Sequence, residues 1–292
     1  MMEIQEINKE NIAPLFPKRA KDTHKGSYGV CAVVGGSQQY TGAAYLSSYA
    51  ALKGGAGYVC LYAPSKILPY FALKSPELIL RNVANGNNIR LNKKKISPVL
   101  TADCIAFGMG AGRGKGTLKT LRYILENYTG KLLVDADGLN ALSTLTDERK
   151  YKLFREKKCQ VLCTPHLKEF ERISGVPLFE IQKNPVEQAR NFARKYGVIL
   201  ALKSSRTIVT DGEKTAVFTG GTPAQAKGGS GDVLSGLIAS IAATGLSLFD
   251  AARSGVYLSG KAAEIAVQKT GEFSLTATDT ADHIARAFLS LL

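Results

Sequence analysis

The sequence has no apolar run long enough to cross a bilayer and no apolar segment near its start. The opening residues read MMEIQEINKENIAPLFPKR, and the longest apolar stretch, Val233 to Phe249, is interrupted by Gly236, Gly245 and several Ser and Thr residues. A membrane span requires roughly 20 consecutive apolar residues, and a signal peptide requires an apolar core. We therefore predict a cytoplasmic protein that makes no membrane contact.

Cysteine is scarce as well. The chain has five cysteines, an odd number with no repeated CxxC pair: Cys31, Cys60, Cys104, Cys159 and Cys163. Four of them lie within or beside apolar runs, which predicts reduced, mostly buried thiols. Cys159 and Cys163 have a CxxxC spacing with no second ligand pair nearby, so structural thiols are favoured over a zinc site.

Signals for nucleic-acid binding are missing, although the chain is basic. It has 38 Lys and Arg against 24 Asp and Glu, a net charge of +14, which predicts attraction for anions such as nucleotides, phosphorylated cofactors or nucleic acids. The basic residues are scattered, no RNP, zinc-finger or helix-turn-helix pattern occurs, and the aromatic residues form no stripe interleaved with basic ones. We therefore expect no nucleic-acid partner.

What is present is a regular alternation of short apolar runs and stretches of helical spacing, in a chain long enough to bury a full core. The apolar runs are Tyr28–Val34, Tyr58–Tyr62, Cys104–Phe107, Lys131–Val134, Gln160–Cys163 and Val198–Leu202. The helical stretches are Ala43–Lys53, Thr117–Asn127, Thr146–Glu156, His166–Ile173 and Val186–Lys195. This order predicts an α/β protein with a mainly parallel sheet and helices on both faces.

The alternation changes near residue 200. Thr207–Thr210 and Thr215–Thr219 are strand-like and flank Asp211-Gly212, which predicts a late antiparallel hairpin. No long linker, low-complexity tract or obvious internal repeat occurs. We expect one domain over residues 1–292, with residues 1–24 as an N-terminal extension.

The strongest local motif is a glycine-rich segment, KGGSGDVLSG, that leads into a helical pattern. The backbone N–H groups of Gly228, Gly229, Ser230 and Gly231 could approach an anion closely, and the helix N-terminus would add its positive end, so we expect a phosphate site here. Asp232 follows. It could accept a proton from a hydroxyl that attacks phosphorus, or it could simply cap the helix. The local pattern leaves both interpretations open.

Other motifs are less specific. The chain has neither a Walker A motif nor a dinucleotide GxGxxG fingerprint. Gly108–Gly112, GMGAG at a strand end, indicates either a tight turn or a close backbone approach to a ligand. Asp135 and Asp137 could bind a metal with nucleotide phosphates or form a turn, and His166 could be a ligand contact or a helix N-terminal turn residue.

Several separated stretches together resemble one family. They are KGSYGVCAVVGGSQQYTGAAYLSSYAALKGGAGYV, FGMGAG, VDADGLNAL, TPHLKEFERISG, LKSSRTIVTDG and AKGGSGDVLSGLIASIAATG. In this order they resemble the ADP- or ATP-dependent NAD(P)H-hydrate dehydratases of the ribokinase-like superfamily, from about Lys25 to the C-terminus. The resemblance implies a ribokinase-like three-layer α/β sandwich that repairs hydrated NADH or NADPH.

The resemblance also implies roles for individual residues. Ala43, Gly110, His166 and Asp232 would contact the hydrated nicotinamide nucleotide, and Asp232 would be the catalytic base. Lys203, Ser204, Ser205, Arg206, Thr207 and Gly231 would hold the adenine nucleotide. Two places depart from the family pattern: GMGAG stands where GPGLG is usual, and Lys203-Ser204 stands where Lys-Gly is usual.

The implied reaction dehydrates (6S)-NADHX or NADPHX by phosphorylating the substrate hydroxyl, which then leaves as phosphate, with ADP converted to AMP. The implied cofactor is Mg²⁺, and ATP is an alternative donor. A homo-oligomer, with a tetramer as one form, and a separate NAD(P)HX epimerase acting on the same pathway are further expectations. The alternative function is a kinase for a vitamin-precursor alcohol.

Overall fold

A ten-stranded sheet runs through the whole molecule, in the order β1-β10-β9-β8-β7-β6-β5-β2-β3-β4. A computed structural model describes residues 4–292. The strands are β1 (Ile4–Glu6), β2 (Val30–Val34), β3 (Tyr58–Pro64), β4 (Ile79–Ala84), β5 (Cys104–Phe107), β6 (Lys131–Val134), β7 (Gln160–Cys163), β8 (Ile199–Leu202), β9 (Thr207–Thr210) and β10 (Thr215–Phe218). Neighbours are parallel except where β9 pairs with β8 and β10. The predicted mainly parallel sheet is confirmed.

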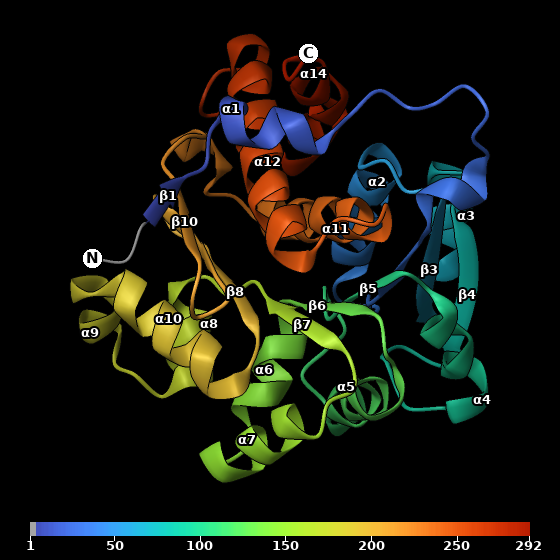
Figure 1. Ribbon diagram of the computed structural model, residues 1–292. Coiled ribbons are helices and arrows are strands. Elements are labelled where there is room, and N and C mark those ends of the chain that lie inside the picture. The colour runs from blue at the N-terminus through green and yellow to red at the C-terminus, as the bar shows by residue number, and fades with distance from the viewer. Residues whose placement is uncertain (1–3) are drawn as a thin grey trace.

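Helices cover both faces of this sheet (Figure 1). They are α1 (Lys9–Ile12), α2 (Thr41–Lys53), α3 (Leu68–Lys74), α4 (Lys93–Ile96), α5 (Lys115–Asn127), α6 (Asp137–Ser143), α7 (Asp147–Arg155), α8 (Leu167–Ser174), α9 (Leu178–Lys183), α10 (Pro185–Tyr196), α11 (Ser230–Ala243), α12 (Leu248–Thr270), α13 (Ala277–Asp282) and α14 (Ile284–Leu289). Within residues 4–292, no helix has both the length and the apolar character that a membrane crossing requires.

Two hydrophobic cores lie on the two faces of the sheet. Successive side chains of a strand point to opposite faces, and in β2 Cys31 and Val33 join the core under α2, α11 and α12, whereas Ala32 and Val34 join the core under α5 and α10. Strands buried on both faces are continuously apolar for this reason. The resulting arrangement is a three-layer α/β sandwich.

The expected elements are present, and several more accompany them. Each predicted strand and helix is found with ends that differ by no more than two residues, and the Asp211-Gly212 hairpin is confirmed as β9 and β10. The edge strand β4 was not predicted, because Arg81 and Asn82 interrupt its apolar pattern at the solvent-facing edge. Part of the expected N-terminal extension also joins the sheet, as β1 pairs with β10.

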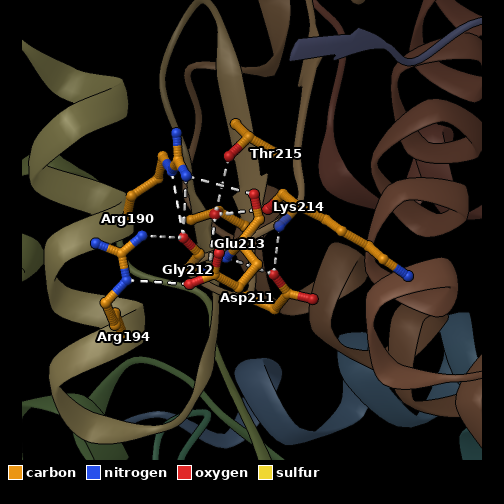
Figure 2. Close-up of polar contacts among 8 residues, drawn as sticks. Arg190, Arg194, Asp211, Gly212, Glu213, Lys214 and Thr215 are labelled. Carbon is orange, nitrogen blue, oxygen red and sulfur yellow. Dashed lines mark hydrogen bonds and ion pairs between the residues drawn. The ribbon is translucent and has the colours of Figure 1, made fainter. Parts of the chain in front are cut away.

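The turn of this hairpin is held by two arginines of α10 (Figure 2). Arg190 and Arg194 both donate to the carbonyl oxygen of Gly212, at 3.2 and 3.1 Å, and Arg194 also donates to the Glu213 carboxylate at 3.1 Å. Gly212 adopts a φ of 99°, which a side chain would disfavour. The contact fixes one end of β9, whose other end follows the exposed Ser204–Arg206 segment.

Helices α2 and α11 cross at a distance that only small residues allow. An added methyl carbon at Gly236 would lie 1.8 Å from the carbonyl oxygen of Ser47. The Ser47 hydroxyl donates to the carbonyl oxygen of Asp232 at 2.8 Å, so the two helices share a hydrogen bond near the start of α11. The position of the glycine-rich segment is therefore coupled to that of α2.

We expect Gly236→Ala to lower the free energy of unfolding by about 3 kcal/mol, because the added methyl carbon forces two backbones apart in a fully packed core. Chemical denaturation of both proteins measures the difference. The control is Gly42→Ala in α2, where no atom lies within 4 Å of the added carbon and φ is ordinary. Equal stability of the Gly236→Ala protein and its parent would contradict the close contact.

Candidate active site

The carboxyl ends of β5, β6, β7 and β8 meet the N-terminus of α11 at one edge of the sheet. Asp135 follows β6, His166 follows β7 after Thr164-Pro165, and Lys203 follows β8 directly. Ligands of open α/β sheets bind at this edge, because the strand ends and the helix N-termini present backbone and side-chain groups there. The edge therefore brings together residues that are far apart in the sequence.

Asp135 and Lys203 form a buried ion pair at the centre of this edge. Lys203 Nζ donates to Asp135 Oδ1 at 3.0 Å, and the Ser235 hydroxyl of α11 donates to Asp135 Oδ2 at 2.7 Å. Burial alone would lower the pKa of Lys203, but Asp135, Glu169 and Asp232 raise the pKa above its ordinary value. Lys203 is therefore a permanent cation, linked to the sheet and to α11 through Asp135.

Asp232 lies in the first turn of α11, beside this pair. Burial raises the pKa of its carboxyl to about 7, with Asp135 adding to the effect and Lys203 opposing it. The cap position of α11 is occupied by Gly229, and no side chain caps the helix. The helix-cap interpretation of Asp232 is thus wrong: this carboxylate is neither the cap nor part of an ion pair, and it can exchange a proton near neutral pH.

The glycine-rich segment leaves the N-terminus of α11 open. Gly229 has a φ of 96°, and a methyl carbon there would contact Leu46 of α2 at 2.6 Å. A methyl carbon at Gly231 would lie 3.1 Å from Lys203 Nζ, so the backbone of this residue approaches the cation closely. An uncapped helix N-terminus beside a lysine is an anion site. The phosphate site stays a prediction, which the open helix N-terminus and the nearby lysine support.

His166 acts as both a helix cap and an exposed polar group. Its Nδ1 accepts from the Glu169 N–H at 3.3 Å, while the Glu169 carboxylate accepts from the His166 N–H at 3.0 Å, a reciprocal capping box. Burial lowers the pKa of His166, with Glu169 acting in the opposite sense and Lys203 in the same sense. The neutral ring therefore carries its proton on Nε2, and its side chain is 51% exposed.

Glu169 is a member of the site that the sequence interpretation missed. It is buried, at 6% exposure, and its charge contributes to the raised pKa values of Lys203 and Asp232. The spacing of His166 and Glu169, three residues apart before a helical pattern, matches a capping box with His in place of Ser or Thr. That spacing is the signal that could have found it.

Gly110 and Ala43 lie against each other at the same edge of the sheet. Gly110 has a φ of 65°, and a methyl carbon there would lie 3.0 Å from Ala43 Cβ and 2.6 Å from the carbonyl oxygen of Tyr40. The structure therefore brings together two of the residues expected to contact the substrate. GMGAG forms a tight turn in which Gly110 contacts the start of α2, and its approach to a ligand stays a prediction.

The Asp137 carboxylate is hydrogen-bonded to the GMGAG loop. Its Oδ2 accepts from the Gly112 N–H at 2.8 Å, and its Oδ1 accepts from Asn140 at 3.2 Å and lies 3.6 Å from Arg113 Nε. The preceding residue, Ala136, has a φ of 48°, the only positive φ at a non-glycine residue in the described chain. Such strain is concentrated at functional sites, where the surroundings enforce it.

The remaining expected nucleotide residues form the β8–β9 connection. Ser204, Ser205 and Arg206 are exposed, and the Ser204 hydroxyl bonds to the backbone of Arg206 in both directions, accepting from its N–H at 3.2 Å and donating to its carbonyl at 2.7 Å. Arg206 also lines a cavity of about 460 Å³ with residues of α10. The connection thus continues directly from Lys203 toward solvent.

The acidic residues of the site do not form a cation cage. In the part of the chain that the structure describes, no group of three or more His, Cys, Asp or Glu residues could hold a metal ion. Both oxygens of Asp135 and of Asp137 already accept hydrogen bonds. A magnesium ion in proteins is often held by one or two carboxylates and substrate phosphates, so Mg²⁺ here fits as part of a bound nucleotide.

Comparison with known proteins gives one consistent result. A family model described as NAD(P)H-hydrate dehydratase matches residues 31–286. The chain is 32% identical to a bifunctional NAD(P)H-hydrate repair enzyme of Thermofilum pendens, over 94% of this chain and 53% of that protein. It is 34% identical to an ADP-dependent (S)-NAD(P)H-hydrate dehydratase of Neisseria meningitidis, over 88% and 83%. The chain spans about half the length of the bifunctional relatives.

Solved structures agree with the fold. An ADP/ATP-dependent NAD(P)H-hydrate dehydratase from Bacillus subtilis, co-crystallised with ATP and Mg²⁺, superposes with a TM-score of 0.86 at 25% identity and full coverage of both chains. A ribokinase-like superfamily protein from Enterococcus faecalis has a TM-score of 0.83 at 22% identity, covering 99% and 96% of the chains. The expected ribokinase-like fold is confirmed.

The raised pKa of Asp232 predicts a pH-dependent effect on stability. The folded protein holds this proton more tightly than the unfolded chain, so the carboxyl stabilises the fold at low pH and loses that contribution as pH rises through about 7. Asn is neutral throughout, so Asp232→Asn should melt at a higher temperature than the parent at about pH 8.5, and the difference should be clearly smaller at about pH 5, where the folded parent still holds the proton. Thermal unfolding at both pH values measures this. Asp22→Asn, on an exposed residue, is the control, and an effect of equal size at both pH values would contradict the raised pKa.

Proposed function

The chain belongs to the NAD(P)H-hydrate dehydratase family, and on that premise we propose that it converts hydrated NADH and NADPH back to NADH and NADPH while ADP becomes AMP and phosphate. The observation that carries the proposal is the position of Asp232. Its carboxyl can take up a proton near neutral pH, beside a permanent cation and an uncapped helix N-terminus.

The chemistry follows from the poor leaving ability of hydroxide. The hydrated substrate carries a hydroxyl on the nicotinamide ring carbon next to the ring nitrogen. Transfer of the terminal phosphoryl group of ADP to this oxygen forms the O–P bond and releases AMP, and Asp232 takes the hydroxyl proton. The ring nitrogen lone pair then expels phosphate, which breaks the C–O bond, and loss of a proton from the neighbouring ring carbon restores the dihydronicotinamide.

The chain supplies electrostatic stabilisation for the transferred group. Lys203 and the N–H groups of Gly228, Gly229 and Gly231 would face the position where phosphate charge accumulates, whereas the Ser230 N–H already donates to the carbonyl oxygen of Lys227 at 3.4 Å. Magnesium, carried by the nucleotide, would neutralise further charge on the phosphates. The Asp135 carboxylate keeps Lys203 in place through the 3.0 Å ion pair.

Two groups would bind the substrate from opposite sides. The exposed ring of His166, whose Nε2 lies 3.5 Å from the Glu169 carboxylate, would contact the substrate on one side, and Ala43 with the adjoining backbone of Gly110 would contact it on the other. On the nucleotide side, Ser204, Ser205, Arg206 and Thr207 extend from Lys203 and would hold ADP. We propose ADP rather than ATP as the donor, in line with the name of the relative from Neisseria meningitidis.

Three expectations on the setting of the enzyme stay predictions. They are a cytoplasmic location, a homo-oligomeric assembly and a separate epimerase that acts on the same hydrates. The bifunctional relatives are about twice as long as the region that matches this chain. This length is consistent with a second repair activity in the part of those proteins that does not match.

Asp232→Asn should lower kcat at least about a hundredfold, because it removes the base while keeping the size of the side chain. In the parent, kcat/KM should rise with pH and reach half its maximum at about 7, since the base must be ionised. The return of dihydronicotinamide absorbance measures both. Asp22→Asn should retain parental turnover, and near-parental turnover of a folded Asp232→Asn protein would remove Asp232 from the mechanism.

The products distinguish a dehydratase from a kinase of the same fold. With hydrated NADH and ADP, the protein should release AMP, inorganic phosphate and NADH in equal amounts, because the phosphate ester beside a ring nitrogen eliminates. Hydroxyethylthiazole or hydroxymethylpyrimidine should support little nucleotide consumption. Rapid conversion of either alcohol to a stable phosphate ester, with hydrated NADH left unchanged, would establish the kinase instead.

A further inference from the structure

A second polar cavity lies beyond the substrate side of the site. It has a volume of about 290 Å³ and is lined by five polar residues and one glycine: Lys66, Asn85, Gly86, Asn87, Asn88 and Arg90. Lys66 follows β3 and the other residues follow β4, so we call this cavity the β4 pocket. None of the proposed catalytic or nucleotide-binding residues lines it.

The β4 pocket lies on the same sheet edge as the reactive groups. Along that edge the strand order is β8, β7, β6, β5, β2, β3, β4, with Lys203 after β8, Asp135 after β6 and Lys66 after β3. Neighbouring strands are about 4.8 Å apart, so Lys66 follows a strand roughly 14 Å from the one that precedes Asp135 and roughly 24 Å from the one that precedes Lys203. The β4 pocket therefore lies toward the opposite end of this sheet edge from Lys203.

Direct contacts join the β4 pocket to the substrate side of the site. The Gln38 N–H donates to the carbonyl oxygen of Asn87 at 2.9 Å, and Gln38 lies two residues before Tyr40, whose carbonyl covers Gly110. On the other side, a methyl carbon at Gly112 would lie 3.6 Å from Asn88 Oδ1. A ligand that extends beyond Gly110 and Ala43 thus reaches the β4 pocket without passing over another helix or strand.

The charge of the pocket selects an anion. Its lining has two cations and no carboxylate, and among residues 4–292 neither Lys66 nor Arg90 has an ion-pair partner. Lys95 adds a third cation nearby, since its Nζ donates to Asn85 Oδ1 at 2.6 Å. The three asparagines supply donors and acceptors that suit sugar hydroxyls and phosphate oxygens. A doubly charged phosphate monoester beside a ribose matches this set.

We propose that the β4 pocket binds the 2′-phosphate on the adenosine ribose of hydrated NADPH, and that the protein therefore prefers hydrated NADPH to hydrated NADH. The proposal rests on the proposed function, because it assumes that the nicotinamide end lies at Asp232. The pyrophosphate of the substrate lies between its two nucleosides and so nearer to Gly110 and Gly112. The adenosine end of the dinucleotide then lies beside Lys66 and Arg90.

The test compares kcat/KM for the two hydrates in the parent, Lys66→Gln, Arg90→Gln and the double variant. The parent should favour hydrated NADPH, and each substitution should lower kcat/KM for hydrated NADPH about tenfold, the effect of one charged hydrogen bond to phosphate. The value for hydrated NADH should change much less. Lys158→Gln is the control, since this exposed lysine precedes the opposite, amino end of β7. Arg90→Glu should lower the hydrated NADPH value further, by repulsion.

Two outcomes would overturn the proposal. An equal loss with both hydrates would show that the pocket binds a part that they share, such as the pyrophosphate, and the absence of any loss would show that it binds neither. Equilibrium binding of NADPH and NADH to the same proteins, measured by calorimetry, gives a readout independent of turnover. If the parent dehydrates neither hydrate, the proposed function fails, whereas a preference for NADPH that disappears in the double variant would still support the pocket.

Discussion

The ion pair between Lys203 and Asp135 is the interaction on which the site depends. The two residues follow β8 and β6, which are separated by β7, and Asp135 also accepts from Ser235 of α11. One carboxylate thus connects two strand ends to the helix that begins at the glycine-rich segment. Removing either partner of a buried pair leaves an uncompensated charge, so neither residue can change alone. The charge on Lys203 in turn limits how far burial raises the pKa of Asp232.

Most of the fold could be predicted from the sequence because its strands are buried on both faces. Runs such as Cys104–Phe107 and Leu132–Val134 are continuously apolar, and the periods of strand and helix alternate clearly. Prediction missed edge strands, short segments and also the long helix α12, Leu248–Thr270, for which no helical stretch was named. In β4 Arg81 faces solvent at an edge, β1 has three residues, and α6 begins inside the DADGLN motif, which has the composition of a turn. Only the folded chain shows that Asp137 begins a helix.

The candidate site was predicted in its residue types but not in its connections. Local reasoning left Asp232 between a base and a helix cap, and the structure excludes the cap because Gly229 is at the cap position. For His166 the structure confirms the helix N-terminal interpretation, since the ring caps α8 through Nδ1 while Nε2 lies 3.5 Å from the Glu169 carboxylate, and the ligand contact stays a prediction. Glu169 and the contact of Asp135 with Ser235 escaped notice because their importance arises from burial and from partners about 30 to 100 residues away. Burial and contacts between distant residues are set by the tertiary structure, which no local sequence pattern encodes.

The close crossing of α2 and α11 has a consequence for how this site tolerates change over evolutionary time. Helix α2 carries Ala43 and helix α11 carries Gly231 and Asp232, so the substrate surface and the phosphate site are each attached to one of two helices that meet backbone to backbone at Ser47 and Gly236. Their spacing is set by main-chain atoms, which every sequence possesses, rather than by interlocking side chains. Core residues elsewhere can therefore be exchanged for others of different shape while Ala43 and Asp232 keep their relative positions, whereas Gly236 can accept no side chain without moving one of the two backbones.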